Sequence, residues 1–336
     1  MTASVRSVAI VGAGLSGLMA ARTLQQQDDV RVTVFEKSRA PGGRAATRRD
    51  GARAFDHGAQ YFTHRDARLA PEMTAWREAG VIVPWSARLA ARDNGSWRVS
   101  RDAETRWVAV PGMRSLGEHL AQGVDVRYAD TVSALRTDAE GWWLHTSEAH
   151  VYGPWDDVLL TMPAPQAYAL LAAHDPSFLE RVASISMQPC IAVLVELASS
   201  PAVPWDAAFV NDDAVLAWVA RNASKPSRGA AECWVLHARA DWSAGQLNAE
   251  PSTLVAPMLE AFGEVLGARV DAVHAVAHRW RYAIPAPVAA DTPLAHYDAA
   301  CGLGVAGDWC AGGRVEGALL SGRAVAEQLL CSPTRR

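Results

Sequence analysis

Apolar and polar positions follow two different periods over the first 36 residues. Ser7 to Val11 is a continuous, largely apolar run, which predicts a short buried strand. Beyond a glycine-rich turn, apolar residues recur at helical spacing as far as Leu24. Val30 to Phe35 then alternates valines with polar residues, as a strand does, and Glu36 follows it. The pattern therefore predicts a strand–helix–strand unit at the start of the chain.

Shorter segments of the same two kinds fill the rest of the chain. Strands are predicted at 124–128, 132–137, 141–146, 158–162, 191–197, 233–238 and 303–306, and helices within 111–121, 251–266 and 315–330. We expect the three strands between 124 and 146 to form a small meander. We expect the strands at 158–162 and 303–306 to join the first two strands in one sheet. Strands that alternate with helices predict an α/β fold.

The turn after the first strand carries the pattern G-x-G-x-x-G at Gly12, Gly14 and Gly17. In such a turn the first glycine permits a tight bend, the second lets the backbone approach a pyrophosphate, and the third allows close packing of helix on strand. Free N–H groups and the dipole at the start of the helix attract anions. Glu36 stands where a carboxylate accepts hydrogen bonds from ribose hydroxyls. A ligand-free turn would leave both the glycines and the acid unexplained, so the unit predicts dinucleotide binding.

Two further segments indicate that the dinucleotide is FAD and not NAD. The Gly-Gly-Arg segment 42–44 follows the acid; its glycines admit a ligand against the backbone, and its arginine can pair with phosphate. By itself this segment also fits a surface turn with solvated arginines. Near the C-terminus a strand ends in Gly-Asp at 307–308, and a helix opens at Val315. This order places Asp308 at the ribityl or pyrophosphate region, with a second helix N-terminus that would stabilise negative charge on a reduced flavin.

Taken together, these motifs resemble the flavin amine oxidase superfamily and, within it, the renalases, particularly their bacterial members. The resemblance rests on the segments G-A-G-L-S-G, F-E-K, G-G-R, D-H-G-A-Q-Y-F, A-G-D-W and V-E-G-A-L-L-S-G-R, which run from the first strand to the last helix. It implies an FAD-dependent oxidase with non-covalent FAD. It also implies a discontinuous Rossmann-like FAD-binding domain (1–62, 108–165 and 285–336) and an interleaved α+β mixed-sheet substrate domain (63–107 and 166–284).

The motifs assign two sets of site residues. The cofactor-binding set is Gly12, Gly14, Leu15, Ser16, Gly17, Glu36, Lys37, Gly43, Arg44, Gln60, Gly307, Asp308, Glu316, Gly317 and Ala318. The catalytic set is Trp280, His237 and Tyr61. Trp280 and His237 match renalase positions that line the substrate cavity, although each taken alone also fits core packing. Trp218, Trp242 and Tyr282 are further candidates for the wall of a flat pocket.

The resemblance to renalases also implies a substrate, namely dihydro-NAD(P) isomers reduced at ring position 2 or 6. Hydride would pass to flavin N5 and then to O2, giving NAD(P)+ and H2O2, and restored aromaticity removes the need for a general base. One alternative is an amine oxidase or desaturase-type oxidoreductase acting on another substrate. Another is a non-enzymatic binding protein similar to GDP-dissociation inhibitors. The intact glycine and Gly-Asp motifs argue against this second alternative.

The lysines weaken the amine oxidase alternative. Many superfamily amine oxidases hold a water near flavin N5 with a lysine, and this chain has only Lys37 and Lys225. Lys37 follows the ribose-binding acid, at the wrong end of the cofactor. Lys225 stands in a segment that predicts a loop, so we expect its side chain to be solvated.

The composition of the chain limits the kinds of binding partner that we expect. The net charge of −4 gives no reason to expect nucleic-acid binding. Five scattered cysteines form no C-x-x-C pair, so we expect no metal site, and a reduced, cytoplasmic setting. The longest apolar stretch, Val8 to Ala21, is too short to cross a membrane. The expected partners are therefore a small-molecule substrate and O2, with neither nucleic acid nor a membrane.

Overall fold

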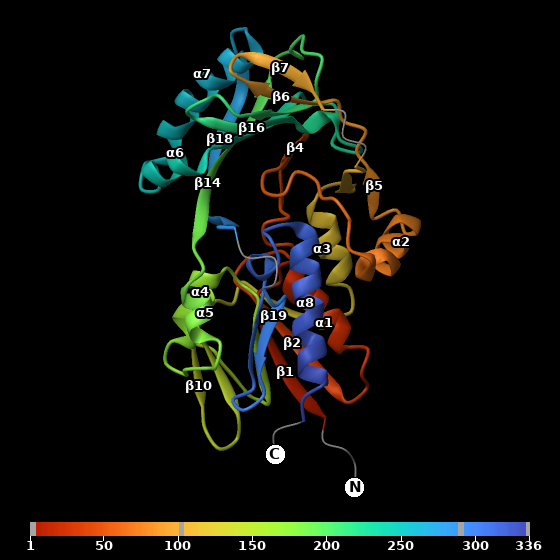
Figure 1. Ribbon diagram of the computed structural model, residues 1–336, viewed down its shortest axis with the longest axis vertical. Coiled ribbons are helices and arrows are strands. Elements are labelled where there is room, and N and C mark those ends of the chain that lie inside the picture. Colours follow the sequence, from red (N-terminus) through yellow and green to blue (C-terminus); the bar gives the residue numbers. More distant parts are fainter. Residues whose placement is uncertain (1–4, 101–103, 288–291, 334–336) are drawn as a thin grey trace.

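The computed structural model describes residues 5–100, 104–287 and 292–333 (Figure 1). A six-stranded sheet occupies the lower half of the view. Its strand order is β19 (Ala295–Asp298), β20 (Leu303–Ala306), β13 (Asp157–Leu160), β1 (Arg6–Val11), β2 (Val30–Glu36) and β9 (Asp125–Tyr128). All neighbours are parallel except β19, which is antiparallel to β20. The first and last segments of the chain thus lie in one sheet.

Both faces of the six-stranded sheet are covered, and every residue of its central strands β20, β13 and β1 is buried. One face carries the helices α1 (Leu15–Leu24), α3 (Arg114–Leu120) and α8 (Val315–Leu330). The other carries α4 (Ala164–Leu171), α5 (Leu179–Ala183) and a meander of β10 (Val132–Thr137), β11 (Trp142–Thr146) and β12 (Val151–Trp155). Alternate residues of β1 divide between these layers: Ile10 packs towards the helices and Val11 towards the meander side.

A seven-stranded sheet arches over the first one in Figure 1. Its order is β18 (Ala272–Pro285), β14 (Met187–Leu197), β17 (Cys233–Ala238), β16 (Leu216–Arg221), β15 (Ala207–Val210), β6 (Leu89–Asp93) and β7 (Ser96–Val99). The outer face of the arch packs on α6 (Ala240–Gly245), η3 (Pro251–Leu254) and α7 (Val255–Leu266). The inner face packs on Phe55 of β4 (Arg53–Asp56), which pairs with β3 (Thr47–Asp50). The inner face is therefore turned towards the motifs of the N-terminal half.

The remaining elements are helices and one further pair of strands. They are η1 (Ala67–Leu69), α2 (Ala70–Glu78), the pair β5 (Ile82–Pro84) and β8 (Trp107–Ala109), η2 (Asn222–Ser224) and η4 (Asp308–Cys310). Within the described part of the chain, no helix combines the length and apolar character that a membrane span requires.

The predicted α/β fold class is confirmed, as is the addition of strands 158–162 and 303–306 to the first sheet. The predicted meander was wrong in one member. Strand 124–128 became β9, which pairs parallel with β2, and β12 takes the third place in the meander. A parallel pair needs a crossover, and α3, which precedes β9, lies on the helical face of the sheet and supplies one. The domain boundaries stay a prediction.

The helices α1 and α8 approach each other unusually closely. A Cβ atom built on Gly322 of α8 would lie 2.0 Å from the carbonyl oxygen of Ser16 in α1. Only glycine fits at this crossing, because any side chain would separate the two backbones. The last helix thereby fixes the position of the first helix's N-terminal turn, where the glycine motif lies.

Candidate functional site

The glycine motif has the backbone geometry that its sequence predicts. Gly12 has φ +111°, a conformation that side chains disfavour. A Cβ on Gly17 would lie 2.0 Å from the Gly12 carbonyl oxygen, so helix and strand meet without a side chain between them. A Cβ on Gly14 would meet no protein atom within 4 Å. The loop therefore leaves open space at the residue that is predicted to approach a pyrophosphate.

One buried polar atom at this loop lacks a partner. The Oγ atom of Ser16, in the first turn of α1, is buried and has no hydrogen-bond partner among the described residues. Buried hydroxyls are nearly always bonded, so this one points to a ligand. Together with the open space at Gly14 and the free N–H groups of α1, it fits an anionic diphosphate.

The Gly-Gly-Arg segment packs directly on the glycine motif. The backbone N–H of Gly42 donates to the Ala13 carbonyl at 2.8 Å. Gly43 has φ +55°, and a Cβ there would lie 3.2 Å from the Cα of Gly14. The two predicted cofactor segments thus form one surface.

Arg44 joins this surface to the C-terminal motif. Its guanidinium makes a bidentate ion pair with Asp308, at 2.5 and 2.9 Å, and donates to the Ala283 carbonyl at 2.8 Å. The residues Arg44 and Asp308 are 264 positions apart. Gly307, beside Asp308, is fixed by a hydrogen bond from its N–H to the Ser321 hydroxyl of α8 at 2.8 Å. Two motifs that the sequence analysis assigned to one cofactor therefore meet in space.

The other predicted cofactor residues differ in their surroundings. Glu36 accepts hydrogen bonds from the backbone N–H groups of Ala13 (2.8 Å) and Ser38 (2.7 Å), whereas Lys37 is exposed. The Glu316 carboxylate accepts from the backbone N–H groups of residues 65 and 66, so it fixes that loop. Leu15, Gly317 and Ala318 lie in the first turns of α1 and α8. Their contact with a cofactor stays a prediction.

An aromatic and histidine cluster lies on the inner face of the arch. The strand register aligns His278 and His237 on either side of Ala192, with Trp218 opposite His237. Residues that face each other in register project from the same face of a sheet. Trp280, two residues after His278 on β18, projects from this face as well. The sequence analysis missed His278, although its spacing of two from Trp280 was a usable signal.

The cluster closes around His57, which follows β4. Trp280 Nε1 and His237 Nε2 both donate to the His57 carbonyl oxygen, at 2.9 and 3.0 Å. The His57 ring stacks on Trp280 at 5.1 Å between centroids and meets His278 edge-on at 4.6 Å. The next two residues return to Arg44, whose carbonyl accepts from the N–H of Ala59 at 3.0 Å. Two predicted catalytic residues are therefore brought together beside the cofactor segments.

These histidines are held neutral. Burial lowers the pKa of His57 to about 3, with the neighbouring His278 adding to the shift. Burial also lowers the pKa of His237 to about 4, and that of His278 falls for the same reason. At neutral pH such imidazoles carry no charge and are weak bases.

Acid should therefore destabilise the protein through these groups. The folded pKa values of His57 and His237 lie below the ordinary 6.5, so between pH 6.5 and 4 the unfolded chain binds protons that the folded chain does not. We expect the free energy of unfolding to fall by roughly 1–2 kcal/mol per pH unit over this window. Denaturant titrations at several pH values measure it. His237→Gln should flatten the slope, and an unchanged slope in this variant would contradict the assignment.

A buried charge cluster lies beneath the His57 loop. Asp56 accepts from Arg228 (2.7 and 2.9 Å) and from the ammonium of Lys225 (3.2 Å), and all three side chains are fully buried. Its other oxygen accepts from Thr47 Oγ1 (2.6 Å) and the Met113 N–H (2.9 Å). Burial would raise the pKa of Asp56, but the two cations outweigh it and hold the pKa below its usual value. No local signal in the sequence linked Asp56 to residues more than 160 positions away.

The expectation of a solvated Lys225 was wrong. Its segment is a short loop after η2, but its ammonium donates to Asp56 (3.2 Å), Gln60 (3.1 Å) and Asn222 (3.2 Å). An ammonium has three donors, so these acceptors leave none for a water. The Gln60 amide nitrogen donates in turn to the Asp56 carbonyl. Lys225 is therefore disfavoured as a water anchor because it is saturated, and Gln60, predicted to bind the cofactor, has its side chain bonded within the cluster.

The remaining aromatic candidates for the substrate pocket lie on different faces of the seven-stranded sheet. Tyr61 lies 5.9 Å from both Trp85 and Trp218, measured between ring centroids, on the inner side of the arch. Trp242 lies in α6 and packs against the core on the outer face, so its assignment to the pocket wall was wrong. The helix α6 lies on the outer side of the sheet, and the local sequence does not predict this position.

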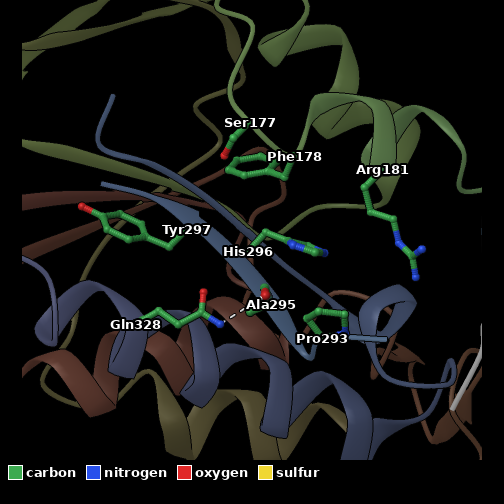
Figure 2. Close-up of a pocket in the computed structure, with 8 residues that line it drawn as sticks. All are labelled: Ser177, Phe178, Arg181, Pro293, Ala295, His296, Tyr297 and Gln328. Atoms are coloured by element: carbon green, nitrogen blue, oxygen red, sulfur yellow. Dashed lines mark hydrogen bonds between the residues drawn. The ribbon is translucent and has the colours of Figure 1, made fainter. Parts of the chain in front are cut away.

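A separate depression of about 510 Å³ lies between α5, β19 and α8 (Figure 2). His296 stacks on Phe178 there at 5.9 Å, and Gln328 donates to the Ala295 carbonyl at 3.2 Å. Figure 2 shows Arg181 at one side of this depression. None of the predicted site residues lines it. Within the described ranges, no three His, Cys, Asp or Glu side chains gather as a metal site.

Comparison with protein families shows which family the chain belongs to. Residues 10–90 match the model of an NAD(P)-binding Rossmann-like domain, and residues 80–330 match that of flavin-containing amine oxidoreductases. The second match covers most of the chain. The chain belongs to the flavin-containing amine oxidoreductase family. This membership confirms the predicted cofactor, FAD bound non-covalently, and the predicted class of enzyme, an FAD-dependent oxidoreductase.

Solved structures of similar fold include two oxidases. A putative protoporphyrinogen oxidase from Exiguobacterium sp. 255-15 aligns with a TM-score of 0.77 at 15% identity, covering 97% of this chain and 98% of its own. Cyclohexylamine oxidase from Brevibacterium oxydans IH-35A aligns with a TM-score of 0.75 at 14% identity, covering 96% and 98%. At such low identity these likenesses establish the fold alone.

One curated relative shares a short stretch of sequence. Coproporphyrinogen III oxidase of Staphylococcus aureus (strain NCTC 8325 / PS 47) is 52% identical over 48 residues, which is 14% of this chain and 10% of that protein. The chain thus matches about a tenth of that relative's length.

The thiol nearest the C-terminal motif suits non-covalent attachment in this amine oxidoreductase. Cys310 is 2% exposed, and burial raises its pKa to about 12. A thiol with such a pKa is protonated at neutral pH and is a poor nucleophile.

Proposed function

We propose that this protein is a renalase-like oxidase of dihydro-NAD(P) isomers reduced at ring position 2 or 6. The observation that carries the proposal is the cluster in which Trp280 and His237 bond the same carbonyl oxygen of His57, beside Arg44. Both residues match cavity positions of renalases. The cluster offers flat aromatic surface for a planar ring.

The chemistry of the cluster suits a hydride donor better than an amine. Bound FAD would supply the hydride acceptor, with O2 as the final oxidant and H2O2 as the product. Amine oxidation benefits from a base or an anchored water, whereas the histidines here have pKa values near 3 and 4 and Lys225 is saturated. A dihydropyridine ring becomes aromatic on losing hydride, so it needs no base. The roles left to Trp280, His237 and Tyr61 are to stack the ring, orient it and exclude water.

Two sets of residues would hold the cofactor. The N–H groups of α1, Ser16 and the open surface at Gly14 suit the diphosphate, with Glu36 at the ribose. Arg44 and Asp308 suit the region between the diphosphate and the flavin ring. A non-enzymatic role similar to that of GDP-dissociation inhibitors has no use for this surface, and the family match also argues against it.

An anaerobic titration tests the proposal. Borohydride-generated dihydro-NAD isomers should bleach the yellow protein within seconds to minutes. On admission of air, one molecule of H2O2 should form for each reduced flavin. Ordinary NADH, putrescine, cyclohexylamine and protoporphyrinogen serve as comparison substrates, the last three because similar proteins carry these names. Rapid bleaching by an amine or a porphyrinogen, with none by the isomers, would replace the proposal with the alternative oxidase.

A further inference from the structure

Three ring N–H groups at the inner face of the arch are satisfied within the protein, whereas the buried Nδ1 of His57 has no hydrogen-bond partner among the described residues. Trp280 Nε1 and His237 Nε2 donate to the His57 carbonyl. Trp85 Nε1 donates to the Ser224 hydroxyl at 3.1 Å. These residues can stack against a substrate, but these N–H groups are already bonded within the protein.

Trp218 is different. It is 7% exposed, and its Nε1 is buried without a hydrogen-bond partner in the described part of the chain. An indole nitrogen is a donor only, so its N–H lacks an acceptor. Buried donors are rarely left in this state, because the lost hydration is not replaced.

The surroundings of Trp218 place this donor within the aromatic and histidine cluster on the inner face of the arch. The indole lies opposite His237 in the strand register, with the Tyr61 ring at 5.9 Å and the Phe209 ring edge-on at 4.7 Å. Trp155 is the other buried indole whose nitrogen lacks a partner in the residues described. It lies in the core between the six-stranded sheet and the meander, edge-on to Phe35 at 6.0 Å. Trp218 therefore combines an unused donor with the predicted substrate wall.

We propose that Trp218 determines specificity by donating its indole N–H to a carbonyl oxygen carried by the planar ring of the substrate. The inference rests on the proposed function for its substrate class, in which that oxygen belongs to the ring carboxamide. A ring without an acceptor would leave the donor unsatisfied on binding. The wall would thus distinguish carboxamide-bearing rings from bare aromatic or aliphatic amines of similar size.

The first test uses the holoenzyme and the dihydro-NAD isomers. Trp218→Phe keeps a flat apolar ring and removes the donor. We expect the Kd obtained from the concentration dependence of flavin bleaching to rise about tenfold, with the limiting bleaching rate within about twofold of the unmodified protein. Trp234→Phe is the matched control, because Trp234 lies on the outer face and donates to Glu232 at 2.8 Å. A Trp218→Phe Kd equal to that of the control would overturn the inference.

The second test does not depend on turnover. Nicotinamide and 3-methylpyridine share a ring but differ in the carbonyl, and perturbation of the flavin absorbance reports their binding. The unmodified protein should prefer nicotinamide by about tenfold, and Trp218→Phe should bind both alike. If the isomers fail to bleach the flavin but the preference disappears in the variant, the proposed function fails while the inference stands. A preference retained in the variant, or absent from the unmodified protein, would overturn it.

Folding of the variant is checked by its thermal midpoint and FAD content. If Trp218→Phe does not fold, Trp218→His takes its place, because an imidazole retains a ring N–H and also changes the geometry of the donor. This variant should keep part of the preference for nicotinamide. A folded Trp218→His protein whose preference for nicotinamide equals that of the unmodified protein would overturn the inference.

Discussion

Replacement of Asp56 by asparagine is expected to lower the free energy of unfolding by about 3–5 kcal/mol. The substitution keeps the shape but removes the charge that two fully buried cations share, Lys225 at 3.2 Å and Arg228 at 2.7 Å. The amide nitrogen of asparagine would also turn a donor towards these donors. Denaturant unfolding of the FAD-loaded protein, followed by tryptophan fluorescence, measures the loss.

The matched control is Asp241→Asn. Asp241 is exposed and pairs with Arg239 at 3.2 Å, so its replacement should lower the free energy of unfolding far less than that of Asp56. The double variant Asp56→Asn, Lys225→Met should lose less free energy of unfolding than the sum of the losses in the two single variants. The reason is that removal of Lys225 reduces the excess of buried positive charge left by Asp56→Asn. Equal stabilities for Asp56→Asn and Asp241→Asn would refute the view of Asp56 as the centre of the cluster.

Substitution of Gly14 by alanine should weaken FAD binding by at least about 100-fold without destabilising the apoprotein. Gly14 has φ −71° and ψ 175°, which alanine adopts freely, and a Cβ there meets no protein atom within 4 Å. The methyl group would instead occupy the space in which the diphosphate approaches the backbone. Loss of two charge-assisted bonds to phosphate accounts for this factor. Flavin fluorescence on reconstitution of the apoprotein gives the Kd.

Two other glycines complete this experiment. Gly17→Ala should disturb the apoprotein itself, since its Cβ would lie 2.0 Å from the Gly12 carbonyl oxygen. Gly245→Ala, at the exposed end of α6, should change neither property, because its Cβ meets nothing within 4 Å. If Gly14→Ala reconstitutes with unaltered affinity, the cofactor does not approach the backbone at this loop.

The parts of the site that local sequence predicted are those in which one segment contains the whole signal. Gly12, Gly14 and Gly17 lie within six residues, and their spacing encodes both a turn and a close helix–strand contact. The joining of Arg44 to Asp308 was predictable only through a shared ligand, because each motif separately pointed to FAD.

The missed features depend on pairing between distant segments. Lys225 was expected in solvent because its own segment forms a loop, but the loop is covered by Asp56 and Trp85, which come from elsewhere in the chain. Likewise β9 was grouped with its sequence neighbours, although the edge of β2 offered a parallel partner. Burial of a polar side chain follows from the tertiary neighbours, and a periodicity of two or 3.6 residues does not report them.

The closure of the six-stranded sheet by β20 and α8 has a consequence for synthesis of the protein. The turn of α1 that would hold the diphosphate is fixed by Gly322, and the Arg44 guanidinium can pair with Asp308 only after 264 further residues have been translated. A ribosome-bound chain would therefore have its glycine loop exposed but incomplete until the last helix emerged. Flavin capture would therefore follow the synthesis of α8, and a chain terminated before α8 would be colourless.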